Sequence, residues 1–367
     1  MATRRLSTFD DWVDYFQVWL KDIDLDPSAT AGYKFEAKYG ELHSPEIEFG
    51  DYRGDRKWEK ILDVPDQRIR DALLHLITYQ GDTEFASVEQ QRHLFATAPS
   101  DHDCQSLVRI MREEIRHGWQ MCHILMTHFG DSGKIEAQKL LERRSFNNNR
   151  LLGSFNEPVE NWLDFFTYTQ FIDRDGKFQL GMLSHSAFAP LARSMGPMLK
   201  EESFHLGTGN NGLKRIIKAG RLPLPIVQKY FNKWIPTAYD LFGSSHSSSA
   251  HWSYVWGLKG RFDEDQNTET PDRDLLNEYA RELYHVEIKG LVDLLNRERP
   301  AGTPALYVPD IRHHRNIGEF AGQRYSVDGR LLDEAAYERH LAETLPSEED
   351  RSTIADFCRQ EGWILSR

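Results

Sequence analysis

The sequence reads Glu114-Ile115-Arg116-His117 and later Glu202-Ser203-Phe204-His205, two copies of the pattern Glu-x-x-His within helical stretches. Residues three apart project from the same face of a helix, so the carboxylate and the imidazole of each tetrad can converge on one metal ion. The same pattern occurs once more, from Glu282 to His285. A single tetrad also arises by chance on a solvated helix, so a second signal has to separate the three.

Spacing provides that signal. Glu84 stands 30 residues before Glu114, and Asp173 stands 29 residues before Glu202. Thirty residues are about enough for one helix-turn-helix return, so each carboxylate can face its tetrad across an antiparallel helix pair. The corresponding positions before Glu282 are Trp252 and Ser253, which cannot supply a carboxylate. The third tetrad is therefore interpreted as structural.

Two repeats of this unit supply four carboxylates and two histidines from four helices, the ligand set of ferritin-like di-iron and di-manganese proteins. Oxygen and imidazole ligands without thiolate favour iron or manganese over a structural zinc ion. We therefore expect two iron ions, with manganese as an alternative. The expected roles are terminal carboxylates for Glu84 and Asp173, bridging carboxylates for Glu114 and Glu202, and one imidazole per ion for His117 and His205. Because buried carboxylates are costly without cations, stability should depend on the metal.

The apolar periodicity predicts a mainly α fold, a ferritin-like four-helix bundle with extra helices and short extended segments towards both ends. Residues 1–64 form an N-terminal extension, residues 65–220 the di-iron bundle, and residues 221–367 a C-terminal helical extension packed on it. The predicted bundle helices start at Pro65 and span 105–129, 161–172 and 190–217, which puts Asp173 at the end of a helix. Further helices are predicted at 9–20, 134–144, after Pro225, at 274–296 and at 334–343, and extended pieces at 33–37, 47–49 and 322–327.

Composition narrows the functional classes. A formal net charge of −12 argues against nucleic-acid binding, which needs a basic face. No apolar run approaches the roughly 18 residues that span a bilayer, so no membrane association is expected. No signal-peptide core follows the start of the chain, and a cytoplasmic location is expected. The three cysteines contain no Cys-x-x-Cys pair, so an iron–sulfur cluster is not expected. If the protein catalyses a redox reaction, its electrons must therefore come from another protein. The oligomeric state is left open.

Segments around these ligands resemble a known family. They include residues 81–92, 113–117, 141–145, 173–180 and 257–261, and they are similar to the oxygenase component of benzoyl-CoA 2,3-epoxidase. A more distant resemblance is to the catalytic subunit of phenylacetyl-CoA epoxidase. The resemblance implies a di-iron oxygenase that activates O₂ and adds one oxygen atom to the aromatic ring of benzoyl-CoA or a related aryl-CoA. It also implies a separate NAD(P)H-dependent flavin/iron–sulfur reductase.

The chain departs from the family pattern at His185, Ala187, Ala189, Ser203 and Leu206. These departures leave open a divergent biosynthetic di-iron oxygenase that hydroxylates, epoxidises or N-oxygenates another aryl compound, free or thioester-bound. If the ligand is a CoA thioester, its phosphates need cations. The candidate basic residues are Lys214, Arg215, Lys218, Lys259, Arg261, Arg312 and Arg315, with His313 and His314.

Residues one or two helical turns from the ligands are candidates for the substrate pocket. They are Ser87, Gln91, Met121, Phe166, Thr169 and Gly209, and His185 joins them as a possible substrate contact. Asp175 is interpreted either as a residue that orients a ligand or caps a helix, or as part of an Asp-Arg-Asp-Gly turn. Tyr79 and Tyr168 precede their helix carboxylates by five residues, about 140° around a helix, so no tyrosine is expected beside the metals. This disfavours a radical-generating reductase subunit.

Overall fold

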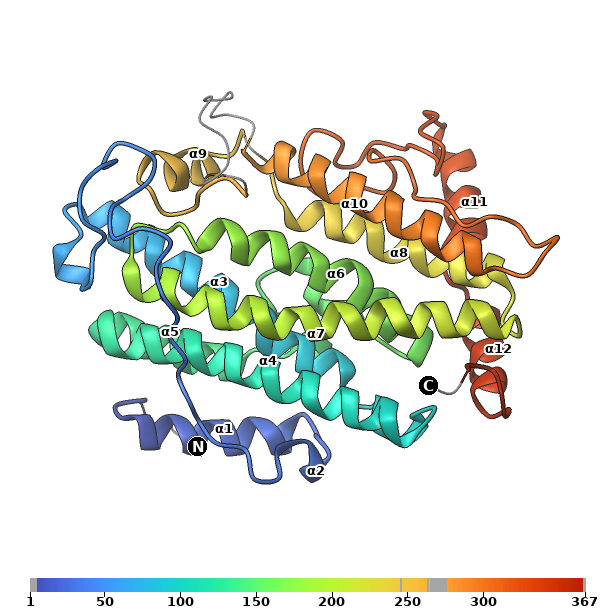
Figure 1. The fold of residues 1–367 in the computed structure, drawn as a ribbon, viewed down its shortest axis with the longest axis horizontal. Coiled ribbons are helices and arrows are strands. Elements are labelled where there is room, and N and C mark those ends of the chain that lie inside the picture. Colours follow the sequence, from blue (N-terminus) through green and yellow to red (C-terminus); the bar gives the residue numbers. More distant parts are fainter. Residues whose placement is uncertain (1–4, 245, 263, 265–275, 366–367) are drawn as a thin grey trace.

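Four long helices form the centre of the molecule (Figure 1). They are α3 (Gln67–Gln91), α4 (Asp101–His128), α6 (Trp162–Leu183) and α7 (Ala189–Ala219). Helix α3 packs on α4 and α6 packs on α7, while contacts between α4 and α7 join the two pairs. The computed structural model describes residues 5–244, 246–262, 264 and 276–365. The predicted mainly α, ferritin-like fold is confirmed.

Local signals in the sequence set the ends of these helices. Side-chain oxygens of Asp66, Ser100 and Asn161 accept backbone N–H bonds in the first turns of α3, α4 and α6. Helix α7 has Pro190 in its first turn, where a missing N–H is harmless, and it ends at Gly220 with φ of 61°. The four ligand-bearing helices are thus delimited by their own caps.

Further helices surround the bundle. In Figure 1, α1 lies along one side of it and α8 and α10 along the opposite side, with α11 and α12 at one end. These outer helices are α1 (Phe9–Asp22), α2 (Pro27–Thr30), α5 (Gly130–Glu142), α8 (Leu224–Leu241), α9 (Ser248–Val255), α10 (Leu276–Glu298), α11 (Glu334–Thr344) and α12 (Glu348–Cys358). Single 3-10 turns are Ile61–Asp63, Leu94–Thr97, Ser145–Asn147 and Gly153–Asn156. Residues 274 and 275 of the predicted 274–296 helix lie outside the described residues.

Of the predicted extended pieces, 322–327 contains one bridge residue, Tyr325, whereas 33–37 and 47–49 contain none. Within the described residues the isolated bridges are Glu46 with Arg56, Trp58 with Phe188, and Tyr325 with Leu331, and no longer ladder forms. One hydrophobic core includes side chains from Leu6 to Ile364, so it draws on all three predicted segments, and their division stays a prediction. No helix in the described part of the chain is both long and apolar enough to cross a membrane.

Helix α6 continues beyond its predicted end. Asp173 lies inside α6, which runs through Asp-Arg-Asp-Gly to Leu183. The turn interpretation of Asp175 was wrong because the polar side chains of this run have partners within the helix. Gln179 Nε2 donates to Asp175 Oδ1 at 2.9 Å, and Arg174 Nε donates to the Gln170 carbonyl at 3.1 Å.

Small residues let α6 and α7 approach closely. A Cβ on Gly209 would lie 2.7 Å from the backbone nitrogen of Gln170, and a Cβ on Gly212 would lie 2.1 Å from the Phe166 ring. These distances are shorter than van der Waals contact. Glycine at both positions therefore sets the separation of the helix that carries Asp173 from the helix that carries Glu202 and His205.

We expect Gly209→Ala to destabilise the fold by about 1–3 kcal/mol, because the added methyl meets backbone that cannot move aside. Gly207 is a matched control on the same helix, since its Cβ would meet nothing within 4 Å. Gly207→Ala should be neutral or stabilise by up to about 1 kcal/mol through helix propensity. Urea unfolding of the two variants measures the difference. Equal midpoints would contradict the close approach.

Candidate metal centre

Six buried side chains from the four central helices meet in the bundle. Candidate ligand atoms of Glu84, Glu114, His117 and Glu202 all lie within 4.8 Å of one another. A second group with the same limit contains Glu114, Asp173 and His205. All six residues predicted from the sequence are therefore brought together, in two groups that share Glu114. Their role as ligands stays a prediction.

Two carboxylates lie between the two histidines. Glu202 places Oε1 3.5 Å from Nδ1 of His117 and Oε2 3.3 Å from Nδ1 of His205. Glu114 does the same, with Oε2 3.9 Å from His117 and Oε1 3.6 Å from His205. A carboxylate whose two oxygens face different imidazoles is placed to bridge two ions. This geometry suits the bridging roles predicted for both residues.

Each histidine also has a carboxylate of its own. Glu84 Oε2 lies 3.3 Å from Nδ1 of His117, and Asp173 Oδ2 lies 3.9 Å from Nδ1 of His205. The site is therefore a two-fold repeat of one terminal carboxylate and one imidazole around a shared carboxylate pair. In both halves, Nδ1 is the imidazole nitrogen that faces the four carboxylates of the cluster.

Unpaired buried atoms provide a test of whether the site fits a cation. Asp173 Oδ2, Glu202 Oε2 and His205 Nδ1 are buried and have no hydrogen-bond partner among the described residues. Buried polar atoms are nearly always hydrogen-bonded, so three unpaired ligand atoms facing one another indicate a missing positive charge. Oxygen and imidazole donors in this ratio fit iron or manganese.

The charges of the cluster are strongly perturbed. Burial, with the negative charge of Glu84, raises the pKa of Glu114 well above its usual value, and burial with Glu202 does the same for Asp173. Burial alone would lower the pKa of His205, but the Glu202 carboxylate, with Glu113 and Asp173, outweighs burial and raises the pKa well above its usual value. Without cations the cluster therefore retains protons, and metal binding must release them.

A second pair of carboxylates holds the outer nitrogens of the two histidines. His117 Nε2 lies 2.8 Å from Oε2 of Glu201 on α7, and His205 Nε2 lies 3.1 Å from Oε2 of Glu113 on α4. The residues that precede Glu202 and Glu114 thus each hold the histidine of the opposite helix. Such contacts fix which nitrogen of the imidazole faces the metal.

The sequence analysis missed Glu113 and Glu201, although a signal was present. Both metal tetrads are preceded by a second glutamate, giving Glu-Glu-x-x-His twice, whereas Arg281 precedes the third tetrad. That third tetrad lies elsewhere: Nδ1 of His285 lies 2.5 Å from the Tyr239 hydroxyl, and the pair belongs to neither ligand group.

Arginines support the two outer carboxylates. Arg116 Nε donates to Glu201 at 2.8 Å, and Arg109 Nε donates to Glu113 at 2.9 Å. Burial would raise the pKa of Glu201, but His117 and Arg116 outweigh it and lower the pKa to about 2. Glu201 is therefore ionised throughout the neutral range and remains an acceptor for the His117 N–H.

We expect Glu201→Gln and Glu113→Gln each to weaken metal binding by about 10- to 100-fold, the usual effect of losing such a partner. The amide has the same shape but no longer stabilises the correct imidazole tautomer. Glu142, an exposed residue on α5, provides the control Glu142→Gln. Anaerobic Fe(II) titration measures the affinities. An unchanged affinity in both variants would show that the histidines need no carboxylate partner.

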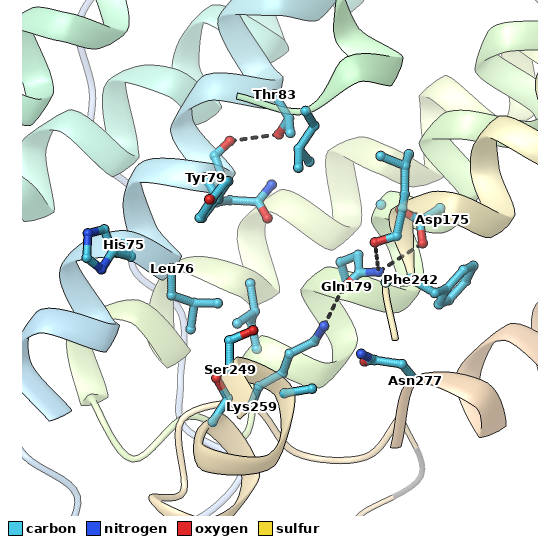
Figure 2. Close-up of a pocket in the computed structure, with 18 of the residues that line it drawn as sticks. His75, Leu76, Tyr79, Thr83, Asp175, Gln179, Phe242, Ser249, Lys259 and Asn277 are labelled. Carbon is cyan, nitrogen blue, oxygen red and sulfur yellow. Dashed lines mark hydrogen bonds between the residues drawn. The ribbon is translucent and has the colours of Figure 1, made fainter. Parts of the chain in front are cut away.

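A cavity of about 670 Å³ opens beside the cluster (Figure 2). Carboxylates of Glu84, Glu114, Asp173 and Glu202 line it, while both histidines lie outside its wall. Further along, apolar side chains dominate, including Leu76, Leu152, Phe155, Ile172, Leu180, Leu183, Phe242, Trp252 and Trp256. A ligand in this cavity would meet the metal-facing carboxylates at one end and an apolar wall along its length.

The predicted pocket residues divide into two groups. Ser87 lines the cavity and its hydroxyl donates to Glu114 Oε1 at 3.2 Å, while Gln91 supports it from behind by donating to Ser87 Oγ at 2.9 Å. The others lie outside the cavity wall. Met121 packs near Gly81, and Phe166 packs against Gly212. The Thr169 hydroxyl donates to the Phe165 carbonyl, and Gly209 lies at the contact between α6 and α7. His185 Nδ1 lies 3.1 Å from Glu48 Oε1.

Asp175 and Gln179 line the cavity on α6 (Figure 2). Asp175 is buried, and burial raises its pKa to about 7. Its oxygen accepts from Gln179, whose own Oε1 accepts from Lys259 Nζ at 2.7 Å. Lys259 and Gln179 thus form a polar site on the cavity wall. The sequence had pointed to Lys259 as a candidate for CoA phosphates, but not to its pairing with Gln179.

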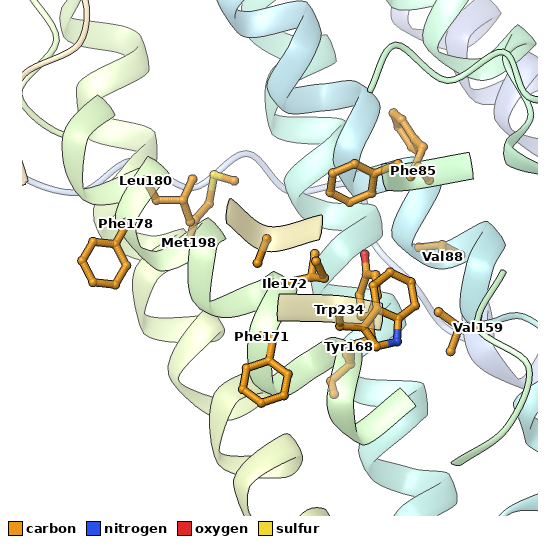
Figure 3. Close-up of a cluster of buried hydrophobic side chains, with 14 of the residues drawn as sticks. Phe85, Val88, Val159, Tyr168, Phe171, Ile172, Phe178, Leu180, Met198 and Trp234 are labelled. Atoms are coloured by element: carbon orange, nitrogen blue, oxygen red, sulfur yellow. The ribbon is translucent and has the colours of Figure 1, made fainter. Parts of the chain in front are cut away.

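Tyr168 also lines the cavity, so the expectation of no tyrosine beside the cluster was wrong. Burial, with the charges of Asp173 and Glu114, raises the pKa of its phenol well above the usual value. The 140° offset was measured to Asp173 on the same helix, whereas the phenol faces across the bundle. Its ring packs edge-on against Trp234 at 5.1 Å, within the aromatic and aliphatic layer of Figure 3.

Most basic residues proposed for CoA phosphates are already neutralised. Lys214 and Lys218 both pair with Glu298, Arg215 with Asp103, Arg312 with Asp310, and Arg315 with Asp240. His313 lies 2.9 Å from the Tyr325 carbonyl, His314 lies 3.1 Å from the Tyr337 hydroxyl, and Arg261 stacks on Tyr279. Lys259 is the member of this group that lines the cavity.

Comparison with known proteins agrees with this geometry. The chain is 37% identical to benzoyl-CoA oxygenase component B of Aromatoleum evansii, over 96% of this chain and 87% of the relative. It is 23% identical to one subunit of the 1,2-phenylacetyl-CoA epoxidase of Escherichia coli (strain K12), over 54% of this chain and 62% of the relative. Residues 59–269 match the family described as phenylacetic acid catabolic protein. The resemblance seen in the sequence is confirmed, and the chain belongs to the phenylacetic acid catabolic protein family.

Proposed function

We propose that this chain is the oxygenase component of a multicomponent enzyme that adds one atom of O₂ to the aromatic ring of an aryl-CoA thioester. The observation that carries the proposal is the pair of buried carboxylate–histidine groups that share Glu114 and border a cavity. The names of both relatives, an oxygenase component and an epoxidase subunit, support this reaction class.

The residues that would hold two iron ions are Glu84, Glu114, His117, Asp173, Glu202 and His205. Bound iron, once reduced by an external electron donor, would supply the site at which O₂ is activated. Around it, Glu113 and Glu201 keep the imidazoles oriented, Ser87 donates to Glu114, and Gln80 donates to Glu84 at 2.5 Å. The apolar cavity wall would exclude water and hold the ring against the cluster.

The length of the cavity supports a thioester over a free acid. Its lining residues run along α3 from Arg68 to Ser87, roughly 28 Å at the rise of an α-helix. A free aryl acid would occupy only part of that length. A CoA thioester, with a flexible arm joined to the acyl group, would extend along it.

Electrons for the reaction would come from a separate NAD(P)H-dependent flavin/iron–sulfur reductase. All three cysteines are free, and neither ligand group contains one. The name component B of one relative supports an assembly with further components.

The experiment is a single turnover under ¹⁸O₂. Iron-loaded protein, reduced without air, receives benzoyl-CoA or free benzoate and then labelled oxygen, and mass spectrometry follows the product. The proposal expects one labelled oxygen atom in the benzoyl-CoA product and none from benzoate. Consumption of O₂ without a labelled product from benzoyl-CoA would reject that substrate and favour a different aryl compound. The absence of O₂ consumption would reject the oxygenase itself.

A further inference from the structure

Among the described residues, Lys259 is the lysine that lines the cavity, and no carboxylate forms an ion pair with it. Its half-buried side chain lines the cavity, and Nζ donates to the neutral amide oxygen of Gln179 at 2.7 Å. Among the described residues, no carboxylate oxygen comes within 4.0 Å of Nζ. Of the cationic side chains on the described wall, Arg68 is exposed and paired with Asp66 at 2.5 Å.

A partly buried ammonium without an ion pair is costly unless something else uses it. An ammonium has three N–H donors, and Gln179 accepts one of them. Gln179 is itself fixed, because its Nε2 donates to Asp175 Oδ1. This chain of contacts, drawn in Figure 2, aims Lys259 without neutralising it. Burial lowers the pKa of Lys259 to about 8, so the group still carries its charge at pH 7.

The position of Lys259 along the cavity matches an acyl group. Its partner Gln179 follows Asp173 by six residues on α6, roughly 9 Å along the helix axis. Ile172, Leu180 and Leu183 line the cavity on this stretch of α6. An aromatic ring held in this apolar stretch, beside the carboxylate cluster, would direct its acyl substituent away from the cluster and towards Lys259.

We propose that Lys259 binds the acyl oxygen of the aryl substrate and thereby sets which edge of the ring faces the metal cluster. The inference rests on the proposed function and adds a substrate-binding residue to it. The shared chemistry is an acyl oxygen acceptor, either the carbonyl of a thioester or the carboxylate of a free acid. The neutral Gln179 acceptor leaves the remaining donors of Lys259 available for that oxygen.

The experiment measures binding of benzoyl-CoA and of benzoate to iron-loaded, oxygen-free protein by calorimetry. We expect Lys259→Met to raise the Kd for the preferred probe by about 10- to 100-fold, the loss of one charge-assisted hydrogen bond. Lys259→Arg should restore most of the affinity. The exposed Lys289 provides the control Lys289→Met, which should bind like wild type. Thermal unfolding should show no loss of stability in Lys259→Met, because no ion pair is removed.

The outcomes separate the anchor from the proposed function. If wild type binds a probe and Lys259→Met binds it equally well, the proposed role of Lys259 (the anchor) is wrong, and the proposed substrate class stands. If wild type binds neither probe, the substrate class and the anchor both fall. Tighter binding of benzoate than of benzoyl-CoA would keep the anchor and reject the thioester. Should Lys259→Met fail to fold, two other variants test the proposal: Gln179→Leu, which removes the residue that orients Lys259, and Lys259→Gln, which removes the charge. Wild-type affinity for the probe in both of these folded variants would overturn the role of Lys259.

Discussion

The Glu114→Gln variant is expected to lose both metal sites together, with the oxygenation rate falling by about 1,000-fold or more, which corresponds to roughly 4 kcal/mol of lost stabilisation. Glu114 is the residue shared by both ligand groups, and its two oxygens face different histidines. An amide is uncharged and a poorer ligand, so one substitution removes a ligand from each ion. Iron content and single-turnover product yield are the measurements.

The same variant should be more stable than wild type when no metal is bound. Burial and Glu84 raise the pKa of Glu114 in the folded state, so the metal-free fold loses stability as the pH rises above the ordinary carboxyl value near 4.5. Glutamine cannot ionise and avoids that cost. Added metal should stabilise wild type, by about 4 kcal/mol at 1,000 times the Kd, and leave the variant unchanged. A metal-free variant that is less stable than wild type at pH 7 would contradict the charge arrangement described here.

Arg150→Met is expected to destabilise the fold by about 3–5 kcal/mol, because it leaves buried Glu89 without a cation and leaves buried Asp82 with only the more distant Arg143, at 3.5 Å. The buried Arg150 guanidinium donates to Glu89 Oε1 at 2.6 Å and to Asp82 Oδ1 at 3.0 Å, both on α3. Glu89 also accepts from Trp19 of α1 at 2.8 Å. The network therefore ties α1 and the segment after α5 to the helix that carries Glu84.

Urea unfolding of metal-free protein measures this effect without interference from the metal site. Arg359→Met is the control, since Arg359 is exposed and pairs with the equally exposed Asp356, and it should change stability by less than about 1 kcal/mol. The double variant Arg150→Met/Glu89→Gln should recover part of the loss, because the charge of Glu89, which has lost its cation, is removed. A small effect of Arg150→Met alone would show that water compensates these carboxylates.

The helices and the convergence of the six candidate ligand residues could be predicted because both depend on short-range regularities. Caps such as Asp66 and Ser100 mark helix starts, and the distances of about 30 residues from Glu84 to Glu114 and from Asp173 to Glu202 follow from helix length. Helix α12 was missed although Ser347 and Asp350 form a capping box at its start. Its apolar periodicity is weak because only Ile354 among its apolar residues is buried.

Residues that act across helices were harder to predict. Glu113 and Glu201 each orient a histidine on another helix, which depends on how α4 and α7 are rotated against each other. Tyr168 lines the cavity although it lies about 140° around α6 from Asp173, so the angle around its own helix wrongly placed its phenol away from the cluster. Lys259 follows α9 in an irregular segment, where no periodicity shows which side chains face inward.

The most direct test of the account is the number of metal ions per chain. Purified protein is titrated with Fe(II) in the absence of air, and bound iron is measured by calorimetry and by Mössbauer spectroscopy. Because two carboxylate–histidine groups share one bridging pair, we predict two ions per chain for wild type, and at most one for His117→Ala or His205→Ala. Wild-type protein that binds a single ion or none, or histidine variants that still bind two, would contradict the di-metal site.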